Sequence, residues 1–193
     1  MNHLLSKIGS YPFEKLNLLL KDIKPSKDVI NLSIGEPKLN ADSKVLDILN
    51  KETNSFSNYP PMNAVPELSE AYRQYLKSHF GIKNVAEDEV CLVAGTREGT
   101  FSIIQALFNK ENVKDKPYVV MPNPFYQIYG GATTLAGGEA KFLDCPEEDN
   151  FQPDLGSLKS EDWQKCQILV LCSPNNPTGS VLPLSKLKDI LDL

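Results

Sequence analysis

The spacing of apolar and polar residues predicts helices in the first part of the chain. Apolar residues recur at helical spacing in three early segments, 13–23, 45–49 and 68–80. Asp42 or Ser43 can cap the second helix, because short polar side chains accept hydrogen bonds from the first turn. Pro66 suits the start of the third helix and Gly81 its end. The first 40 residues show no strand pattern, which indicates an arm or a small subdomain.

Strands alternate with helices from residue 89 onward. Short apolar runs between turn residues predict strands at 89–95, 118–121, 140–143 and 168–172. Helices are expected from about Thr96 to Phe108, after Pro124 and after Pro183. The first of these should turn four apolar side chains inward: Phe101, Ile104, Leu107 and Phe108. The uninterrupted run at 168–172 predicts a strand buried on both faces. This alternation indicates an α/β fold, with a mostly parallel sheet and helices on both faces.

Composition excludes several classes of protein. The 193 residues are 41% hydrophobic, enough for one domain of ordinary size. With 25 acidic and 20 basic residues and no basic block, nucleic acid is not expected as a partner. The longest apolar runs are too short to span a membrane. Four cysteines without Cys-x-x-Cys spacing and two isolated histidines argue against a zinc site, a disulfide framework and a Ser-His-Asp hydrolase. Reduced thiols fit a cytoplasmic protein.

Candidate chemistry follows three of the predicted strands. The turn at 95–99 leads into a helix whose first amides, with Arg97, can bind an anion. Tyr126 follows the second strand and can stack on a planar ligand. Asn176, between two prolines, can present a fixed amide after the fourth. Each feature alone also fits ordinary packing or a loop exit. Together, at the carboxyl ends of parallel strands, they predict a pocket for a planar aromatic phosphate, such as pyridoxal 5′-phosphate.

Five motifs carry a resemblance to a known family. In chain order they are NLSIGEP at 31–37, YPP at 59–61, AGTREG at 94–99, NPFYQIY at 123–129 and SPNNPTG at 173–179. In order and spacing they resemble the class I and II aminotransferases of fold type I, from about residue 30 to the end. Within that family, the stretch 123–143 is most similar to the succinyldiaminopimelate transaminases. The resemblance implies the large domain of a pyridoxal-phosphate-dependent transferase.

The resemblance implies roles for four residues at the cofactor. Thr96 and Arg97 would supply backbone amides to its phosphate. Tyr126 would stack on the pyridine ring, and Asn176 would donate to the phenolic oxygen. In the same family pattern, the Asn123-Pro124 and Asn176-Pro177 peptide bonds are expected to be cis.

Two more residues would act at the edges of the site. Tyr59 would reach the phosphate of the second subunit in a homodimer, and Gly35 would present its backbone to the substrate carboxylate. Ala64 stands where the family usually has a glycine, which affects the turn that places Tyr59. The resemblance makes 1–40 an N-terminal arm with part of the small domain, and 41–193 the N-terminal part of the large domain.

No catalytic residue is assigned within the chain. The family's Schiff-base lysine is expected downstream of Gly179, and the helix after Pro183 lacks the usual signals for a helix end. The chain is therefore expected to be the amino-terminal portion of a longer enzyme and inactive alone.

The implied activity is amino transfer between N-succinyl-L,L-2,6-diaminopimelate and 2-oxoglutarate, in lysine and diaminopimelate biosynthesis. Two alternatives stay open. One is another enzyme of this family, either an aspartate or aromatic aminotransferase or a C–S lyase. The other is a truncated protein that binds a phosphate ligand or a full-length subunit without catalysis.

Overall fold

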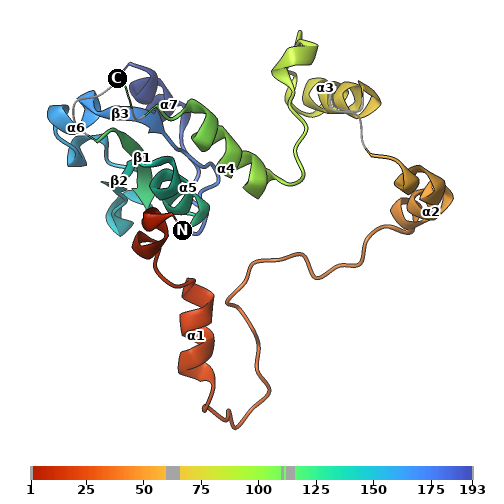
Figure 1. Ribbon diagram of the computed structural model, residues 1–193, viewed down its shortest axis with the longest axis horizontal. Helices are drawn as coiled ribbons and strands as arrows, with labels where there is room; N and C mark the ends of the chain where they lie inside the picture. The colour runs from red at the N-terminus through yellow and green to blue at the C-terminus, as the bar shows by residue number, and fades with distance from the viewer. Residues whose placement is uncertain (1, 60–65, 110, 112–115, 193) are drawn as a thin grey trace. The chain divides into compact units, whose positions relative to one another are not determined.

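The computed structural model describes residues 2–59, 66–109, 111 and 116–192 (Figure 1). The chain forms two compact units. One unit contains Phe13–Leu92, and the other combines the N-terminal residues through Pro12 with the chain from Val93 onward. The domain boundary expected near residue 40 stays a prediction.

The unit formed by residues 13–92 contains the expected early helices. They are α1 (Pro12–Leu20), α2 (Ser43–Lys51) and α3 (Pro66–Phe80), with short 3₁₀ helices η2 (Thr53–Ser57) and η3 (Glu87–Glu89). Asp42 caps α2, since its side chain accepts a hydrogen bond of 2.8 Å from the backbone amide of Lys44. Gly81 has a φ of +68° directly after α3, a conformation that glycine adopts without a steric penalty. Both predicted helix boundaries are confirmed.

The second unit is built on a parallel sheet. Its described strands are β1 (Tyr118–Asn123), β2 (Glu139–Asp144) and β3 (Cys166–Leu169), in the spatial order β2-β1-β3. Val119 lies opposite Ala140 of β2 and Ile168 of β3. Because β1 is central, it has a neighbour on each side, and Val119, Val120 and Met121 are fully buried. The predicted α/β class is confirmed.

Helices cover both faces of this sheet. Val119 and Met121 share one face and form a core cluster with Phe108 and Tyr129. Those two residues come from the C-terminal end of α4 (Thr96–Leu107) and from α5 (Ile128–Ala136). The opposite face meets α6 (Ser160–Gln164), and the chain then continues to α7 (Leu184–Leu191).

The contact with α6 is an ion pair. Lys141 lies beside Val120 in the sheet register, and its Nζ is 3.2 Å from Oδ1 of Asp162 on α6. The same ammonium group lies 4.8 Å from the centre of the Tyr118 ring. Since neighbouring residues along a strand point to opposite faces, α6 lies on the side of the sheet away from α5.

Two strand predictions were wrong. Residues 90–95 form no strand, although Val90 has extended backbone angles, because no described segment pairs with them. The run at 168–172 is not buried on both faces. Its strand ends at Leu169 with one further bond, from the Val170 amide to Val120 O at 2.8 Å. All of β3 is half-buried because it has one neighbour, β1, among the described strands.

The inward face predicted for α4 was partly wrong. Ile104 and Phe108 are buried and Phe101 is half-buried, but Leu107 is 63% exposed. Leu107 follows Ile104 by three residues, whereas the buried Phe108 follows it by four. The residues of this helix that pack toward α5 are therefore spaced four apart, as in Ile104 and Phe108.

Candidate cofactor site

The first part of the candidate site is the N-terminus of α4. Gly95 is the N-cap with a φ of +111°, and no side chain of its own caps the helix. A Cβ at Gly95 would lie 2.8 Å from Oε2 of Glu98, so the Glu98 carboxylate folds back over this glycine. Thr96 and Arg97 are exposed in the first turn, where backbone amides lack partners within the helix. This end of α4 can therefore bind an anion through amides and the Arg97 charge.

A hollow of about 350 Å³ lies beside these residues. It is lined by Arg97, Glu98, Phe101, Ser102 and Ile128. The first four belong to α4, and Ile128 is the first residue of α5. The start of α5 therefore faces the same space as the predicted anion-binding turn.

The second part is the aromatic segment that leads from β1 into α5. The half-buried Tyr126 ring meets the Tyr129 ring edge-on, with centroids 5.7 Å apart and an interplanar angle of 90°. Tyr129 is only 7% exposed. Burial, followed by contacts with Cys172 that include a hydrogen bond, raises the pKa of Tyr129 to about 12. The Tyr126 ring is thus supported on one side by the buried, neutral Tyr129 ring.

The third part is the loop after β3, where the two adjacent asparagines differ sharply. Asn175 is 8% exposed, whereas Asn176 is exposed. The Asn175 amide donates to Thr178 Oγ1 at 3.0 Å and, over a longer 3.5 Å, to the carbonyl of Pro124. Asn176 accordingly presents its amide at the surface while Asn175 holds the loop.

Three peptide bonds of this region are cis. Asn123-Pro124 and Asn176-Pro177 were predicted and are confirmed, whereas Ser173-Pro174 was not predicted. All three lie in the segments that follow β1 and β3.

The strand order explains why these segments meet. Strand β1 connects through α5 to β2 on one side, and β3 joins it on the other side. The carboxyl ends of β1 and β3 therefore lie next to each other, and the order of the strands reverses between them. Open α/β sheets bind ligands at such points.

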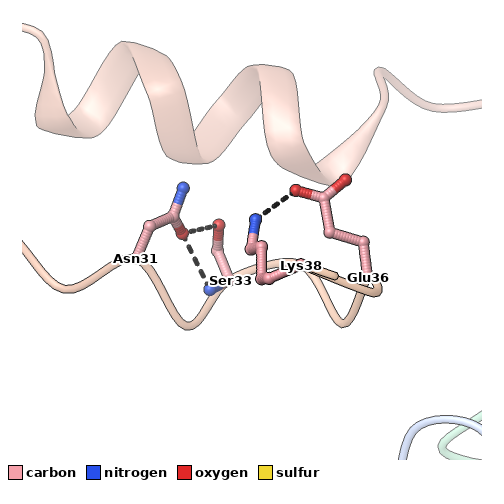
Figure 2. A network of polar contacts seen from close by, with 4 residues as sticks. All are labelled: Asn31, Ser33, Glu36 and Lys38. Carbon is pink, nitrogen blue, oxygen red and sulfur yellow. Dashed lines mark hydrogen bonds and ion pairs between the residues drawn. The ribbon is translucent and has the colours of Figure 1, made fainter. Parts of the chain in front are cut away.

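Gly35 and Tyr59, the other two predicted site residues, belong to the unit Phe13–Leu92. Tyr59 is 99% exposed. Gly35 is exposed within a polar segment shown in Figure 2. There Oδ1 of Asn31 accepts hydrogen bonds from the amide and hydroxyl of Ser33, and Lys38 pairs with Glu36. Ala64 lies outside the described residues.

Sequence reasoning placed Asn175, Tyr129 and Cys172 in these segments but assigned none of them a role. The two adjacent asparagines could have indicated a separate role for Asn175, because one exposed amide is enough to contact a ligand. The contact of Tyr129 with Cys172 joins residues far apart in the chain, and no local pattern indicates it.

Other types of site have no support in the described part of the chain. Its histidine, cysteine and carboxylate side chains form no group that could hold a metal ion. The four cysteines are free thiols. No helix there is both long and apolar enough to cross a membrane.

The fold is that of an α/β protein, and its candidate site lies in one unit, beside the switch point of the sheet. The family profile of aminotransferase class I and II matches residues 27–193. The chain belongs to this family, whose cofactor is pyridoxal 5′-phosphate.

Individual relatives agree with this assignment. The chain is 28% identical to an LL-diaminopimelate aminotransferase of Natranaerobius thermophilus, over 93% of this chain and 46% of the relative. It is also 28% identical to an aspartate aminotransferase of Pyrococcus horikoshii, over 93% of this chain and 44% of that protein. An aminotransferase structure from Neisseria meningitidis matches with a TM-score of 0.90 and 39% identity, over 100% of this chain and 49% of that one. The chain thus spans about half the length of these relatives.

Proposed function

We propose that this protein is part of a pyridoxal-phosphate-dependent aminotransferase and supplies residues that hold the cofactor. The observation that carries the proposal is the pairing of an anion-binding helix end with an aromatic ring and a surface amide. All three lie in one compact unit, in a chain that belongs to the aminotransferase family.

The residues present fit the cofactor chemically. A Cβ at Gly95 would lie 2.8 Å from Oε2 of Glu98, so a phosphate at this end of α4 requires the exposed, flexible Glu98 side chain to turn away from Gly95. There Thr96 and Arg97 would hold the phosphate by backbone amides, with the Arg97 charge adding to the attraction. Bound pyridoxal phosphate supplies a ring that withdraws electrons from the α-carbon of an amino acid.

Two further side chains would orient the ring. Tyr126, supported from behind by Tyr129, would pack against its face and exclude water from that side. Asn176 would donate a hydrogen bond to the phenolic oxygen and so favour its ionised form. The chain thus contributes binding and orientation, and no residue in it is assigned the proton transfer at the substrate.

For the substrate, we propose N-succinyl-L,L-2,6-diaminopimelate, with 2-oxoglutarate as the amino acceptor, in lysine and diaminopimelate biosynthesis. The support is the similarity of residues 123–143 to the succinyldiaminopimelate transaminases. A second candidate is unmodified diaminopimelate, because several relatives at about 28% identity are named LL-diaminopimelate aminotransferases.

Assembly and location are also proposals. A homodimer would give Tyr59, which is 99% exposed, a partner's phosphate to contact, and Gly35 would serve the substrate carboxylate. We place the protein in the cytoplasm on the strength of its four free thiols. The division into an arm with small-domain residues (1–40) and a large-domain part (41–193) belongs to the same proposal.

A binding experiment on the 193-residue chain tests the cofactor site. Pyridoxal phosphate should bind reversibly, and borohydride reduction followed by mass spectrometry should show no specifically labelled lysine. Arg97→Ala should weaken binding by up to several-fold, since an exposed pair of opposite charges contributes about 0.2–1 kcal/mol. Lys159→Ala is the matched control, because it removes one exposed positive charge near α6. Equal affinity of the two variants would contradict the assignment of the phosphate to α4.

A further inference from the structure

Asn175 joins the two loops that carry the cofactor-binding side chains. Its Nδ2 donates to Thr178 Oγ1 within its own loop and, at 3.5 Å, to the Pro124 carbonyl of the loop after β1. Its backbone closes the turn as well. The Asn175 amide donates to Ser180 O at 2.8 Å, and its carbonyl accepts from the Gly179 amide at 2.7 Å. One buried residue thus connects both ends of this turn with the neighbouring loop.

A second connection joins the same two segments. Tyr129, on α5, lies close enough to Cys172, which follows β3, for this thiol to raise the pKa of the tyrosine, after the larger effect of burial. The Cys172 thiol in turn donates to the carbonyl of Pro174 at 3.1 Å. The segment that carries Tyr126 and the segment that carries Asn176 are therefore held together at two points.

We propose that Asn175 is a positioning residue that sets the direction of the Asn176 amide relative to the Tyr126 ring. This inference rests on the proposed function, in which both side chains contact the cofactor ring. Asn176 is exposed and follows Asn175 directly, so the turn that Asn175 closes decides where the Asn176 side chain points. Pre-orientation of a donor matters because an amide that must first be ordered loses part of its interaction energy.

The contacts of Asn175 also say which replacements disrupt it. Its Oδ1 is buried and accepts no hydrogen bond from the described part of the chain, whereas Nδ2 makes both side-chain contacts. Asn175→Ala removes both contacts. Thr178→Val removes the hydroxyl that accepts from Nδ2 but keeps the shape, and Thr178→Ser keeps that hydroxyl.

The test uses two measurements on the full 193-residue chain. The first is the near-ultraviolet pH titration of the phenol of pyridoxine 5′-phosphate, a probe that needs no lysine because it has no aldehyde. A donor that favours the ionised phenol lowers its pKa. The second is hydrogen exchange at the Gly179 amide, with the amides of Val119–Met121 in β1 as the reference for an intact fold.

The expected results separate Asn175 from Asn176. Asn176→Ala should shift the phenol's ionisation equilibrium by about tenfold toward the neutral form, and Asn175→Ala by a smaller factor in the same direction. Exchange at Gly179 should become faster in Asn175→Ala and stay unchanged in Asn176→Ala. Thr178→Val, which also removes the acceptor of the Ser180 amide but leaves the contact with Pro124, should shift both measurements in the same direction as Asn175→Ala, and Thr178→Ser should behave like the unmodified chain.

Three other outcomes are possible, and each contradicts either the positioning role of Asn175 or the assignment of Asn176. If Asn176→Ala shifts the phenol but Asn175→Ala and Thr178→Val do not, the positioning role is wrong and the proposed function stands. If Asn176→Ala has no effect on the phenol, the assignment of Asn176 is wrong and the positioning role falls with it. If Asn175→Ala loses β1 protection and has unfolded, Thr178→Val and Thr178→Ser decide, and equal behaviour of these two overturns the inference.

Discussion

Replacing Gly138 by alanine should destabilise the unit that contains the sheet. A Cβ at this position would lie 2.4 Å from Cζ of Phe108, and 2.9 and 3.1 Å from two other atoms of the same ring. The ring cannot turn away freely, because Phe108 is 9% exposed and packs with Val119, Met121 and Tyr129. Either the ring or the start of β2 must move.

The loss of folding free energy can be estimated from overpacked cores of other proteins. Adding a methyl group where no space exists typically costs about 1–3 kcal/mol. With a urea dependence of about 1–3 kcal/mol/M for a small protein, the unfolding midpoint should fall by about 1 M. Fluorescence of Trp163, the one tryptophan of the chain, can follow the transition, since it lies in the same unit.

A matched glycine provides the control. Gly131 lies within α5, and a Cβ there would have no neighbour within 4 Å. Gly131→Ala should therefore leave stability unchanged or raise it by about 0.5–1 kcal/mol, because alanine favours a helix interior over glycine. The same chemical change thus has opposite signs at two positions only seven residues apart.

A double-mutant cycle identifies the cause of the loss. Phe108→Leu removes the ring atoms that the new methyl group would meet, so Gly138→Ala should cost much less in that background. The reasoning would be refuted if Gly138→Ala cost the same with leucine at 108, or if it lowered the midpoint no more than Gly131→Ala does.

Two further predictions concern single side chains. Absorbance titration should show one tyrosine with a pKa of about 12, absent in Tyr129→Phe. Because this pKa is raised above the value of 10 for an unfolded chain, its contribution to stability is complete below pH 10 and is lost as the pH rises toward 12. A titration without this late step would contradict the buried contact with Cys172. Asp42→Ala should weaken α2 by about 1 kcal/mol, seen as faster hydrogen exchange in its first turns. Asp47→Ala, within the same helix, should have a smaller effect, and equal effects would exclude the cap.

The sequence predicted features that depend on local contacts. The cap by Asp42 and the end of α3 at Gly81 follow from a few neighbouring residues, and both are confirmed. The strand predicted at 118–121 is also confirmed and extends to Asn123, because an apolar run between turn residues describes a central strand of a parallel sheet. Arg97, Tyr126 and Asn176 lie in one unit, as one site requires, and Tyr126 and Asn176 follow strands as expected, whereas the strand predicted before Arg97 is not formed.

Features that depend on distant partners could not be predicted in the same way. The run at 168–172 has the composition of a buried strand, but exposure depends on whether a second strand lies beside it. Val90 has extended angles but pairs with no strand among the described residues, so the apolar pattern alone predicted a strand that does not form there. The buried role of Asn175 depends on Pro124, which lies 51 residues earlier in the chain.

The order β2-β1-β3 also has a consequence for synthesis of the chain. Strand β1 is made first and β2 pairs with one side of it, but the other side waits until η4 (Glu147–Asp149), η5 (Leu155–Ser157) and α6 have followed. During that interval the later centre of the sheet is an edge strand with free backbone groups and the apolar residues Val119–Met121. Nascent chains that pause before β3 emerges from the ribosome therefore expose an unpaired edge of β1, and such chains are prone to aggregate.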